Sequence, residues 1–171
     1  MDDVVTEAPR PEARAPRSAK RHLLRAIFFS ILGGIVLLGL MQLVPYRVDN
    51  PPVRQEPSWD SPRTRQLAAV ACFDCHSNET HTYTWEEIAP LSWWITNHVK
   101  EGRGALNFSE CTRGPGENEA SETVRDGSMP PSYYTWFGLH SNAKLTAAQR
   151  QELASGLSAT LSGWDCGQGG E

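Results

Sequence analysis

The sequence predicts an all-α domain carried on a single N-terminal transmembrane helix. Three observations support this: a charge-free stretch of 19 residues near the N-terminus, later segments with helical caps and spacing, and no clear period-2 strands. With 171 residues, of which 39% are hydrophobic and 21% charged, the chain suffices for about one globular domain. We divide it into a disordered tail (1–22), an anchor (23–44), a proline-rich tether (45–60) and a globular domain (61–171).

The charge-free stretch is residues 26–44, which as a helix would span about 28 Å, close to the hydrocarbon thickness of a bilayer. Six Lys and Arg residues precede it, whereas only Arg47 and Arg54 follow it closely. The positive-inside rule therefore places the N-terminus in the cytoplasm and the globular domain in the periplasm or an equivalent space. A cleaved signal peptide is the alternative, but its apolar region is usually about 7–15 residues long, and no A-x-A-like site follows here.

The tether and the first helix are marked by prolines. Five prolines between residues 45 and 62 disfavour both helix and central strand, so we expect a semi-rigid, extended spacer. Its 16 residues could reach at most about 50 Å. Ser61-Pro62 then supplies a capping residue and a first-turn proline for a helix over RTRQLAAVA.

Two further helices are predicted from spacing. The segment LSWWITNHVKEGR follows Pro90, and Gly102 is expected to end it. Its apolar positions are Leu91, Trp94, Ile95 and Val99. Thr146 is expected to cap AAQRQELASGLSATL. The leucines on one face of that helix are Leu153, Leu157 and Leu161. A core of roughly 110 residues is small, so a large apolar ligand or a cross-link would help it fold.

Residues 72–76 read Cys-Phe-Asp-Cys-His, the C-x-x-C-H attachment motif of a c-type haem. The thiols of Cys72 and Cys75 would form thioethers with the two vinyl groups of one porphyrin, and His76 would be the proximal iron ligand. A thioredoxin-like C-x-x-C would need a βαβ context, and a zinc site would need a second pair of ligands. The sequence offers neither, so it predicts one covalent haem c.

Met129, in the run Ser-Met-Pro-Pro, is the strongest candidate for the distal iron ligand. It is the only methionine besides the initiator and one in the anchor, and Met/His ligation raises the reduction potential of a haem. His81, His98 and His140 are rival ligands, and an open sixth position is the remaining alternative.

Aromatic residues gather in the sequence near the motif and near residues 128–131, the run around Met129 that we name the methionine loop. We expect most of them to fill the core and to wall a haem crevice against water. They are Trp85, Trp93, Trp94, Tyr133, Tyr134 and Trp136.

Two further cysteines, Cys111 and Cys166, stand outside the motif. In an exported domain such a pair is more often bridged than free, although free or intermolecular thiols are the alternative. The bridge would close a loop of 56 residues and stabilise the domain by about 4 kcal/mol.

Residues 41–160 resemble the bacterial haem-binding domain family of membrane-tethered, single-haem c-type proteins. The matching pieces are QLVPYRVDNPPV, CFDCHSNETHTYTWEEIAPLSWWITNHVKEGRGALNFSE, SMPPSYYTWFGLH and AKLTAAQRQEL. The resemblance implies haem on the two motif cysteines, a proximal histidine and a methionine as the sixth ligand: Cys72, Cys75, His76 and Met129. The chain departs from the family pattern at Cys111, where members often have Trp, and in TRGPGENEASETVRDG, which is broken by Gly and Pro instead of forming a continuous acidic helix.

Together these observations predict an all-α, cytochrome c-like haem domain on a single N-terminal transmembrane helix. It would carry single electrons at the membrane, as a carrier or as a subunit of a respiratory or photosynthetic complex, and would not be an enzyme. Its partners would be the lipid bilayer and redox donor and acceptor proteins; a net charge of −6 over residues 46–171 disfavours nucleic acid. The alternatives are an open-site haem protein, such as a gas sensor or haem enzyme, and an accessory structural subunit of a membrane complex.

Overall fold

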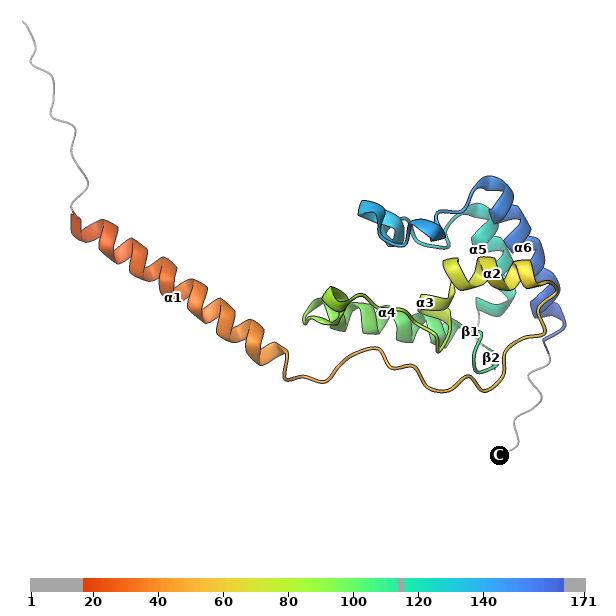
Figure 1. Cartoon of the computed structure of the whole chain (residues 1–171), viewed down its shortest axis with the longest axis horizontal. Helices are drawn as coiled ribbons and strands as arrows, with labels where there is room; N and C mark the ends of the chain where they lie inside the picture. The colour runs from red at the N-terminus through yellow and green to blue at the C-terminus, as the bar shows by residue number, and fades with distance from the viewer. Residues whose placement is uncertain (1–16, 114–115, 165–171) are drawn as a thin grey trace, which may run out of the picture. The chain divides into compact units, whose positions relative to one another are not determined.

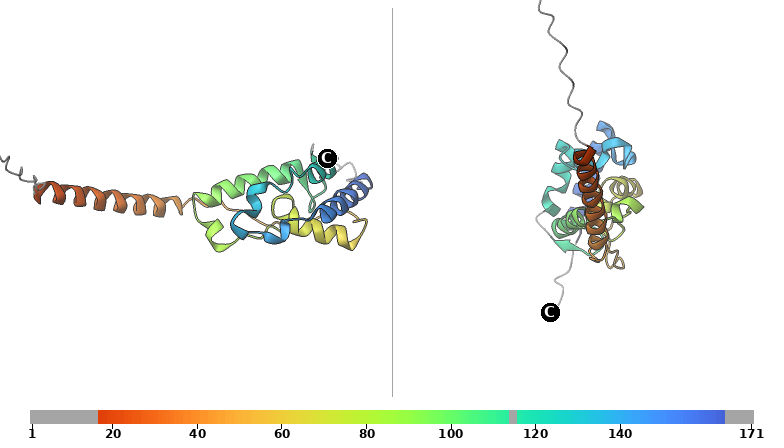
Figure 2. Two further views of the ribbon diagram at one scale, coloured as in Figure 1. Left: turned by 90° about the horizontal axis from the view of Figure 1, so that it is seen from above. Right: turned by 90° about the vertical axis from the view of Figure 1, so that its left-hand side faces the viewer.

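The computed structural model describes residues 17–113 and 116–164, which divide into two units between Val44 and Pro45 (Figures 1 and 2). The described part is mostly helical, which confirms the predicted all-α class. Its α-helices are α1 (Arg17–Met41), α2 (Pro62–Ala71), α3 (Phe73–His76), α4 (Leu91–Ala105), α5 (Gly116–Asp126) and α6 (Ala147–Ser162). Shorter elements are the 3₁₀ helices η1 (Thr84–Glu87), η2 (Ser132–Gly138) and η3 (Ser141–Ala143), and the strands β1 (Leu106–Asn107) and β2 (Thr112–Arg113).

The first unit contains α1, whose segment Ala19–Met41 is long and apolar enough to cross a membrane. The helix begins at Arg17, within the tail predicted for residues 1–22, because Arg, Lys and Ala are strong helix formers. It ends at Met41, three residues before the predicted end of the anchor. The rest of the predicted tail, residues 1–16, lies outside the described residues.

The two predicted helix caps are confirmed. The Ser61 hydroxyl accepts a hydrogen bond from the backbone N–H of Thr64 at 3.1 Å, and Pro62 is the first residue of α2. At α6, the Thr146 hydroxyl accepts from the N–H of Gln149 at 3.2 Å, while the Gln149 side chain accepts from the N–H of Thr146 at 2.9 Å. Each cap satisfies N–H groups that have no partner within the helix.

The core of the second unit lies where α2 and α5 pack against α6. The three leucines predicted on one face of α6, residues 153, 157 and 161, are all buried. Gly156 lies on the same helix against Thr64 of α2, so closely that a Cβ at residue 156 would clash with the threonine side chain. An aromatic group completes the core: Trp59, Phe73, Phe108 and Trp164, with neighbouring ring centroids 5.3–6.4 Å apart.

Residues 45–60 do not form the free spacer that the prolines suggested. They run along the second unit without helix, and hydrogen bonds join them to it at both ends. Near the start the Tyr46 hydroxyl donates to the Asn97 side chain at 2.6 Å, and near the end the Asp60 N–H donates to the Thr160 hydroxyl at 3.1 Å. The prolines keep the segment extended, and this extended backbone packs on the domain.

Helix α4 differs from its prediction in length and orientation. It continues past Gly102 to Ala105, so the glycine does not end it. Its buried residues are Ser92, Thr96 and Val99, whereas the predicted apolar positions Leu91 and Trp94 are exposed. The spacing of apolar residues predicted the helix correctly, but the face that the fold buries carries mostly small side chains instead of the large apolar ones.

The segment after Cys111 is also more regular than its sequence suggested. Strands β1 and β2 form a short antiparallel pair, with Leu106 opposite Arg113. Helix α5 then begins at Gly116, and the ten residues that follow contain neither Gly nor Pro, so the expectation of a broken segment is wrong from residue 116 onwards. This helix packs against α6 and forms one wall of the site.

Candidate functional site

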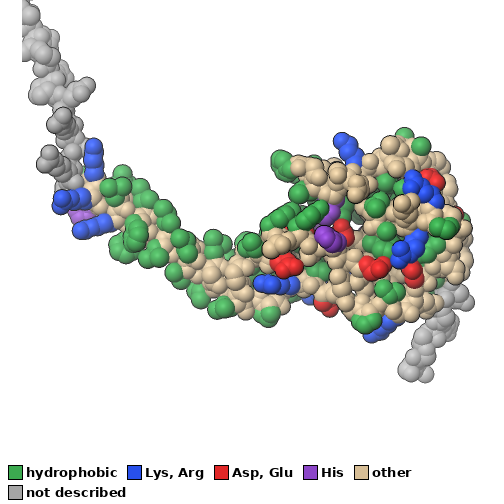
Figure 3. All heavy atoms as spheres, in the orientation of Figure 1, with side chains coloured by type: hydrophobic (Ala, Val, Ile, Leu, Met, Phe, Trp, Pro, Cys, Tyr) green, Lys and Arg blue, Asp and Glu red, His purple; other side chains and the backbone are tan. Residues whose placement is uncertain are grey.

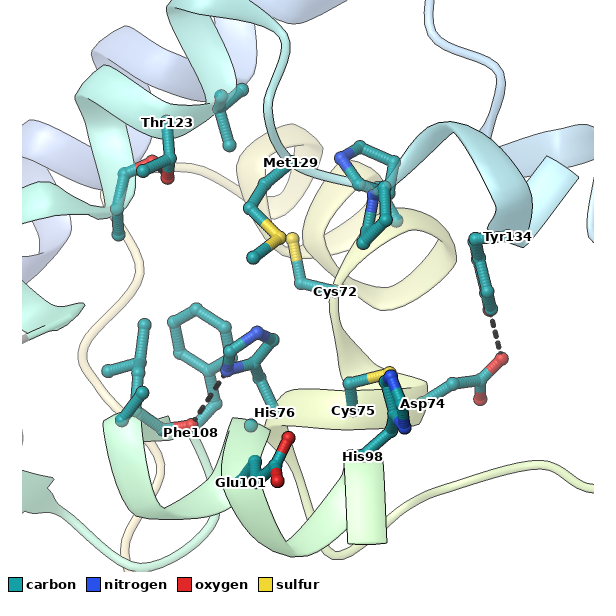
Figure 4. Close-up of a pocket in the computed structure, with 18 of the residues that line it drawn as sticks. Cys72, Asp74, Cys75, His76, His98, Glu101, Phe108, Thr123, Met129 and Tyr134 are labelled. Atoms are coloured by element: carbon teal, nitrogen blue, oxygen red, sulfur yellow. Dashed lines mark hydrogen bonds between the residues drawn. The ribbon is translucent and has the colours of Figure 1, made fainter. Parts of the chain in front are cut away.

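The C-x-x-C-H motif begins at Cys72, which caps the end of α2, and its other four residues form the short helix α3. The Cys72 N–H donates to the Ala68 carbonyl at 2.8 Å, and the Cys72 carbonyl accepts from the N–H groups of Cys75 and His76 at 3.1 and 2.9 Å. The side chains of Cys72, Cys75 and His76 therefore reach the same cavity from a single turn of the chain (Figure 4).

Both motif cysteines are half-buried and form no disulfide. The pKa of Cys72 is raised to about 12, mainly because desolvation disfavours the thiolate and secondarily because Cys75 lies nearby. The pKa of Cys75 is raised to about 11, again mainly by desolvation and secondarily by the negative charge of Asp74. Catalysts of thiol–disulfide exchange instead need a lowered thiol pKa, because the thiolate is the reactive form. The site is therefore unsuited to thioredoxin-like chemistry.

Backbone carbonyl groups, chiefly that of Leu106, orient the His76 imidazole. Its Nδ1 lies 3.0 Å from the carbonyl oxygen of Leu106 in β1, so Nδ1 carries the proton and donates it to this bond. Figure 4 shows the other ring nitrogen on the cavity side. Burial lowers the pKa of His76, which keeps the ring neutral. A neutral imidazole with Nδ1 bonded and Nε2 free has the form of a metal ligand.

The cavity has a volume of about 430 Å³ and is walled by the motif, α4, β1, α5 and the methionine loop. Most of its lining is apolar; Leu106, Phe108, Val124 and Leu157 contribute from four different segments. This size and character suit a flat apolar cofactor more than a small polar substrate.

Met129 enters the same cavity from a different element than His76. In Figure 4 its thioether points into the cavity from the side of α5, opposite the histidine. Its N–H donates to the Thr123 carbonyl at 2.9 Å, and Arg150 of α6 donates to its carbonyl oxygen at 3.5 Å. The methionine loop is thus tied to α5 and α6, and the predicted pair of ligand candidates faces one space.

The three histidines that are alternative candidates for the distal iron ligand differ in their position relative to the cavity. His98 of α4 lines the cavity, and its ring packs against that of Trp94 at a centroid distance of 4.1 Å, with the two planes tilted by 44°. His81 and His140 are not among the residues that line this cavity. His140 instead lies 3.4 Å from the Asp74 carboxylate and 3.7 Å from that of Glu86.

A polar cluster beside the motif was not predicted from the sequence. Asp74, one of the two variable motif residues, accepts a hydrogen bond from the hydroxyl of Tyr134 in η2, and the Tyr134 ring stacks on His140 at 4.0 Å. Burial, followed by Asp74, raises the pKa of Tyr134, so the hydroxyl remains protonated and donates. The cluster connects the motif to the methionine loop across 60 residues of sequence, and no spacing pattern signals it.

Gly102 is a second position whose role the sequence did not reveal. A Cβ there would clash with the backbone carbonyl of Cys75, so the glycine lets α4 approach the motif directly. Gly104, two residues later, has open space around it. The close approach of α4 brings His98 and Glu101 to the cavity edge.

The aromatic residues expected to wall the crevice divide into two groups. Tyr133 and Tyr134 line the cavity, as expected. The four tryptophans do not, and Trp85, Trp94 and Trp136 are exposed. The expectation that these aromatic residues fill the core or wall the crevice therefore holds for the two tyrosines and is wrong for Trp85, Trp94 and Trp136, which the fold places at the surface.

Of the two remaining cysteines, Cys111 packs against the core. Cys166 lies outside the described residues, so the predicted disulfide stays a prediction.

Comparisons with known proteins agree with this geometry. A family model described as a haem-binding domain matches residues 36–159, which include the motif, the cavity walls and the methionine loop. Neither the curated proteins nor the solved structures contain a match to the chain.

Proposed function

The chain belongs to the haem-binding domain family, and from that premise we propose that it is a membrane-anchored, single-haem c-type cytochrome that carries electrons. The second unit would hold one haem c through thioethers to Cys72 and Cys75. His76 would be the proximal iron ligand and Met129 the distal one. Haem supplies an iron that exchanges one electron between Fe(II) and Fe(III).

The observation that carries the proposal is the convergence of four groups on one apolar cavity. The two motif thiols and the His76 ring come from one helical turn, and the Met129 thioether comes from a loop 53 residues later in the chain. The Leu106 carbonyl holds the imidazole in the tautomer that a metal ligand needs. The apolar walls exclude water, which favours the reduced form and raises the reduction potential.

A filled sixth position would favour a carrier over an enzyme. If His76 and Met129 both bound the iron, no coordination position would remain open to a substrate. The residues then have positioning roles: Leu106 orients the histidine, and Thr123 and Arg150 hold the loop that bears the methionine. Electrons would pass at the haem edge to redox partner proteins, as in a subunit of a respiratory or photosynthetic complex.

The membrane location rests on α1 and its flanking charges. The segment Ala19–Met41 is long and apolar enough to span a membrane, and six basic residues precede its charge-free part, which begins at residue 26, so we propose a single-pass anchor with a cytoplasmic N-terminus. The haem domain would then lie in the periplasm or its equivalent, where covalent haem attachment takes place. A disulfide between Cys111 and Cys166 would be compatible with that compartment.

The test is an optical spectrum of the detergent-purified full-length protein, oxidised and reduced, with and without CO. We expect a reduced c-type spectrum, a weak Met-to-iron band at the red edge of the oxidised spectrum, and no change with CO. A high-spin spectrum that shifts with CO would overturn the carrier proposal in favour of an open-site gas sensor or haem enzyme. Absence of covalently bound haem would overturn the c-type assignment.

A further inference from the structure

One end of the second unit exposes a group of large apolar side chains, which we name the aromatic end. Its members come from η1, the start of α4 and η2: Trp85, Ile88, Leu91, Trp94, Trp136 and Phe137. Phe137 is 96% exposed, and Trp136 and Ile88 are more than half exposed. In Figures 1 and 2, η1 with the start of α4 and the η2 segment lie at the same end of this unit. Exposed apolar groups of this size mark an interaction surface.

Ring contacts through Tyr133 join three members of the aromatic end, Trp94, Trp136 and Phe137, beside the cavity. The Trp94 and Tyr133 centroids are 5.7 Å apart, those of Tyr133 and Trp136 are 6.4 Å apart, and those of Trp136 and Phe137 are 6.4 Å apart. Tyr133 also lines the cavity, so this surface adjoins the mouth of the site. Figure 3 shows hydrophobic side chains gathered on this end of the unit.

The backbone presents Phe137 outwards at a cost. Its φ is +56°, a left-handed conformation that is unfavourable for a residue with a Cβ, and Gly138 follows with φ +79°. Because the Phe137 side chain is almost fully exposed, its burial against the described residues does not offset that cost. A partner that covers the ring would offset it.

Most of the aromatic end comes from segments without charge: no Asp, Glu, Lys or Arg occurs between Asp126 and Lys144, or between Glu87 and Lys100. The acidic residues beside Trp85 in η1 are Glu86, which is buried, and Glu87, which lies 4.0 Å from Arg47. Protein docking surfaces of redox carriers gain speed and orientation from charge, and little unpaired charge is presented here. Trp, Tyr and Phe without charge, bordered by basic residues such as Lys100, are instead typical of surfaces at the membrane–water interface.

The covalent link to α1 points to the same occupant. The Tyr46 hydroxyl bonds Asn97, on the turn of α4 after Trp94, and Arg47 lies 4.0 Å from Glu87, next to Ile88. The chain therefore joins the second unit beside the aromatic end. Only four residues, 42–45, separate Tyr46 from the end of α1, and the five Cα–Cα steps reach no more than about 18 Å. If α1 spans a bilayer, Tyr46 lies within that distance of the end of α1, which keeps the adjoining aromatic end near the bilayer surface.

We propose that the aromatic end seats in the lipid headgroup region of the membrane that α1 anchors. Trp and Phe side chains would enter the interface, while Arg47 and Lys100 would meet phosphate groups at its rim. The mouth of the haem cavity would then face the membrane side, which favours exchange with redox partners embedded in the bilayer. This inference rests on the proposed membrane anchor.

The test measures the depth of spin labels in the full-length haem-loaded protein, reconstituted as one copy per nanodisc of phosphatidylcholine and phosphatidylglycerol. Labels are placed at Phe137→Cys and, separately, at Ile88→Cys. Ser158→Cys is the control, exposed on α6 at the other end of the unit. Power saturation with oxygen and with a nickel chelate then reports whether each label lies in lipid or in water.

We expect the ratio of oxygen to nickel accessibility to be several-fold higher at residues 137 and 88 than at residue 158. Equal ratios at all three positions, in protein that co-elutes with the discs, would overturn the inference while leaving the anchor intact, and would assign the aromatic end to a protein partner. Protein that fails to enter discs at all would overturn the anchor and the inference with it. The haem spectrum of each variant shows that it has folded.

Discussion

Gly102 of α4 lies against the carbonyl group of Cys75 so closely that no Cβ fits between them. This contact, between a helix and the turn that carries the motif, sets the floor of the cavity. It also explains why α4 runs through the glycine instead of ending there. Glycine destabilises a helix relative to alanine because it loses more conformational entropy on folding, but only glycine allows α4 to pack this closely on the motif.

Replacing Gly102 by Ala is expected to destabilise the domain by about 1–3 kcal/mol, because the new methyl group must displace backbone at the motif. Gly104→Ala, on the same helix but with open space around it, is the matched control. It should gain up to about 1 kcal/mol from helix propensity. Thermal unfolding of both variants measures the difference, and equal effects would show that α4 does not depend on the contact.

Removing the Tyr134 hydroxyl is expected to loosen the methionine loop. Tyr134→Phe deletes a hydrogen bond to the Asp74 carboxylate, a loss of about 1.5–3 kcal/mol for a bond to a charged group. Tyr46→Phe, which deletes the bond to Asn97 instead, is the control. Only the first variant should weaken the Met-to-iron band and admit CO. If both variants keep an unchanged band, the cluster does not position Met129.

The covalent haem should depend on both motif cysteines. Cys72→Ala/Cys75→Ala protein, expressed with the haem-attachment machinery, should carry no haem that survives denaturing electrophoresis. Each single variant should retain one thioether at most. Cys111→Ala is the control and should keep its covalent haem. Haem that stays bound to the double variant under denaturing conditions would contradict the attachment site.

Replacing Met129 by Ala should empty the sixth position. The variant should lose the red-edge band, bind CO and show a lower reduction potential, because a thioether favours reduced iron. Met129→His should restore a low-spin spectrum while keeping the potential low. A Met129→Ala spectrum identical to that of the original protein would transfer the role to a histidine, and His98 would be the first to test because it lines the cavity.

The predicted disulfide can be measured directly. Peptide mapping without reductant should recover Cys111 and Cys166 in one linked pair. Breaking it with Cys111→Ala should lower the free energy of unfolding by up to about 4 kcal/mol, since the bridge closes a loop of 56 residues. Recovery of both cysteines as free thiols from freshly prepared protein would refute the pairing.

Local features of this protein were predictable because they depend on residues near one another in sequence. The apolar run of α1, the caps at Ser61 and Thr146, and the buried leucine face of α6 are confirmed in the structure. The C-x-x-C-H motif likewise places three side chains on one turn by spacing alone, and the resemblance to the haem-binding domain family is confirmed by the matching family model.

Other features depended on contacts between distant segments, which no local pattern encodes. Residues 45–60 read as a spacer because proline excludes helix, but hydrogen bonds to α4 and α6 fix them on the domain. The apolar spacing of α4 located the helix, yet tertiary packing buries Ser92, Thr96 and Val99 and leaves Trp94 exposed. The glycine and proline residues after Cys111 suggested that no continuous helix forms in this segment, but helix α5 begins at Gly116.

By itself, then, the sequence determined the helical class, the apolar anchor, the attachment motif and the candidate ligands. Only the tertiary structure decided that His76 and Met129 share one cavity, that Leu106 orients the imidazole, and that Asp74 meets Tyr134. The physical reason is distance along the chain. Caps, spacing and apolar periodicity act within a few residues, whereas packing decides which of many possible partners, 30 to 60 residues away, each side chain meets.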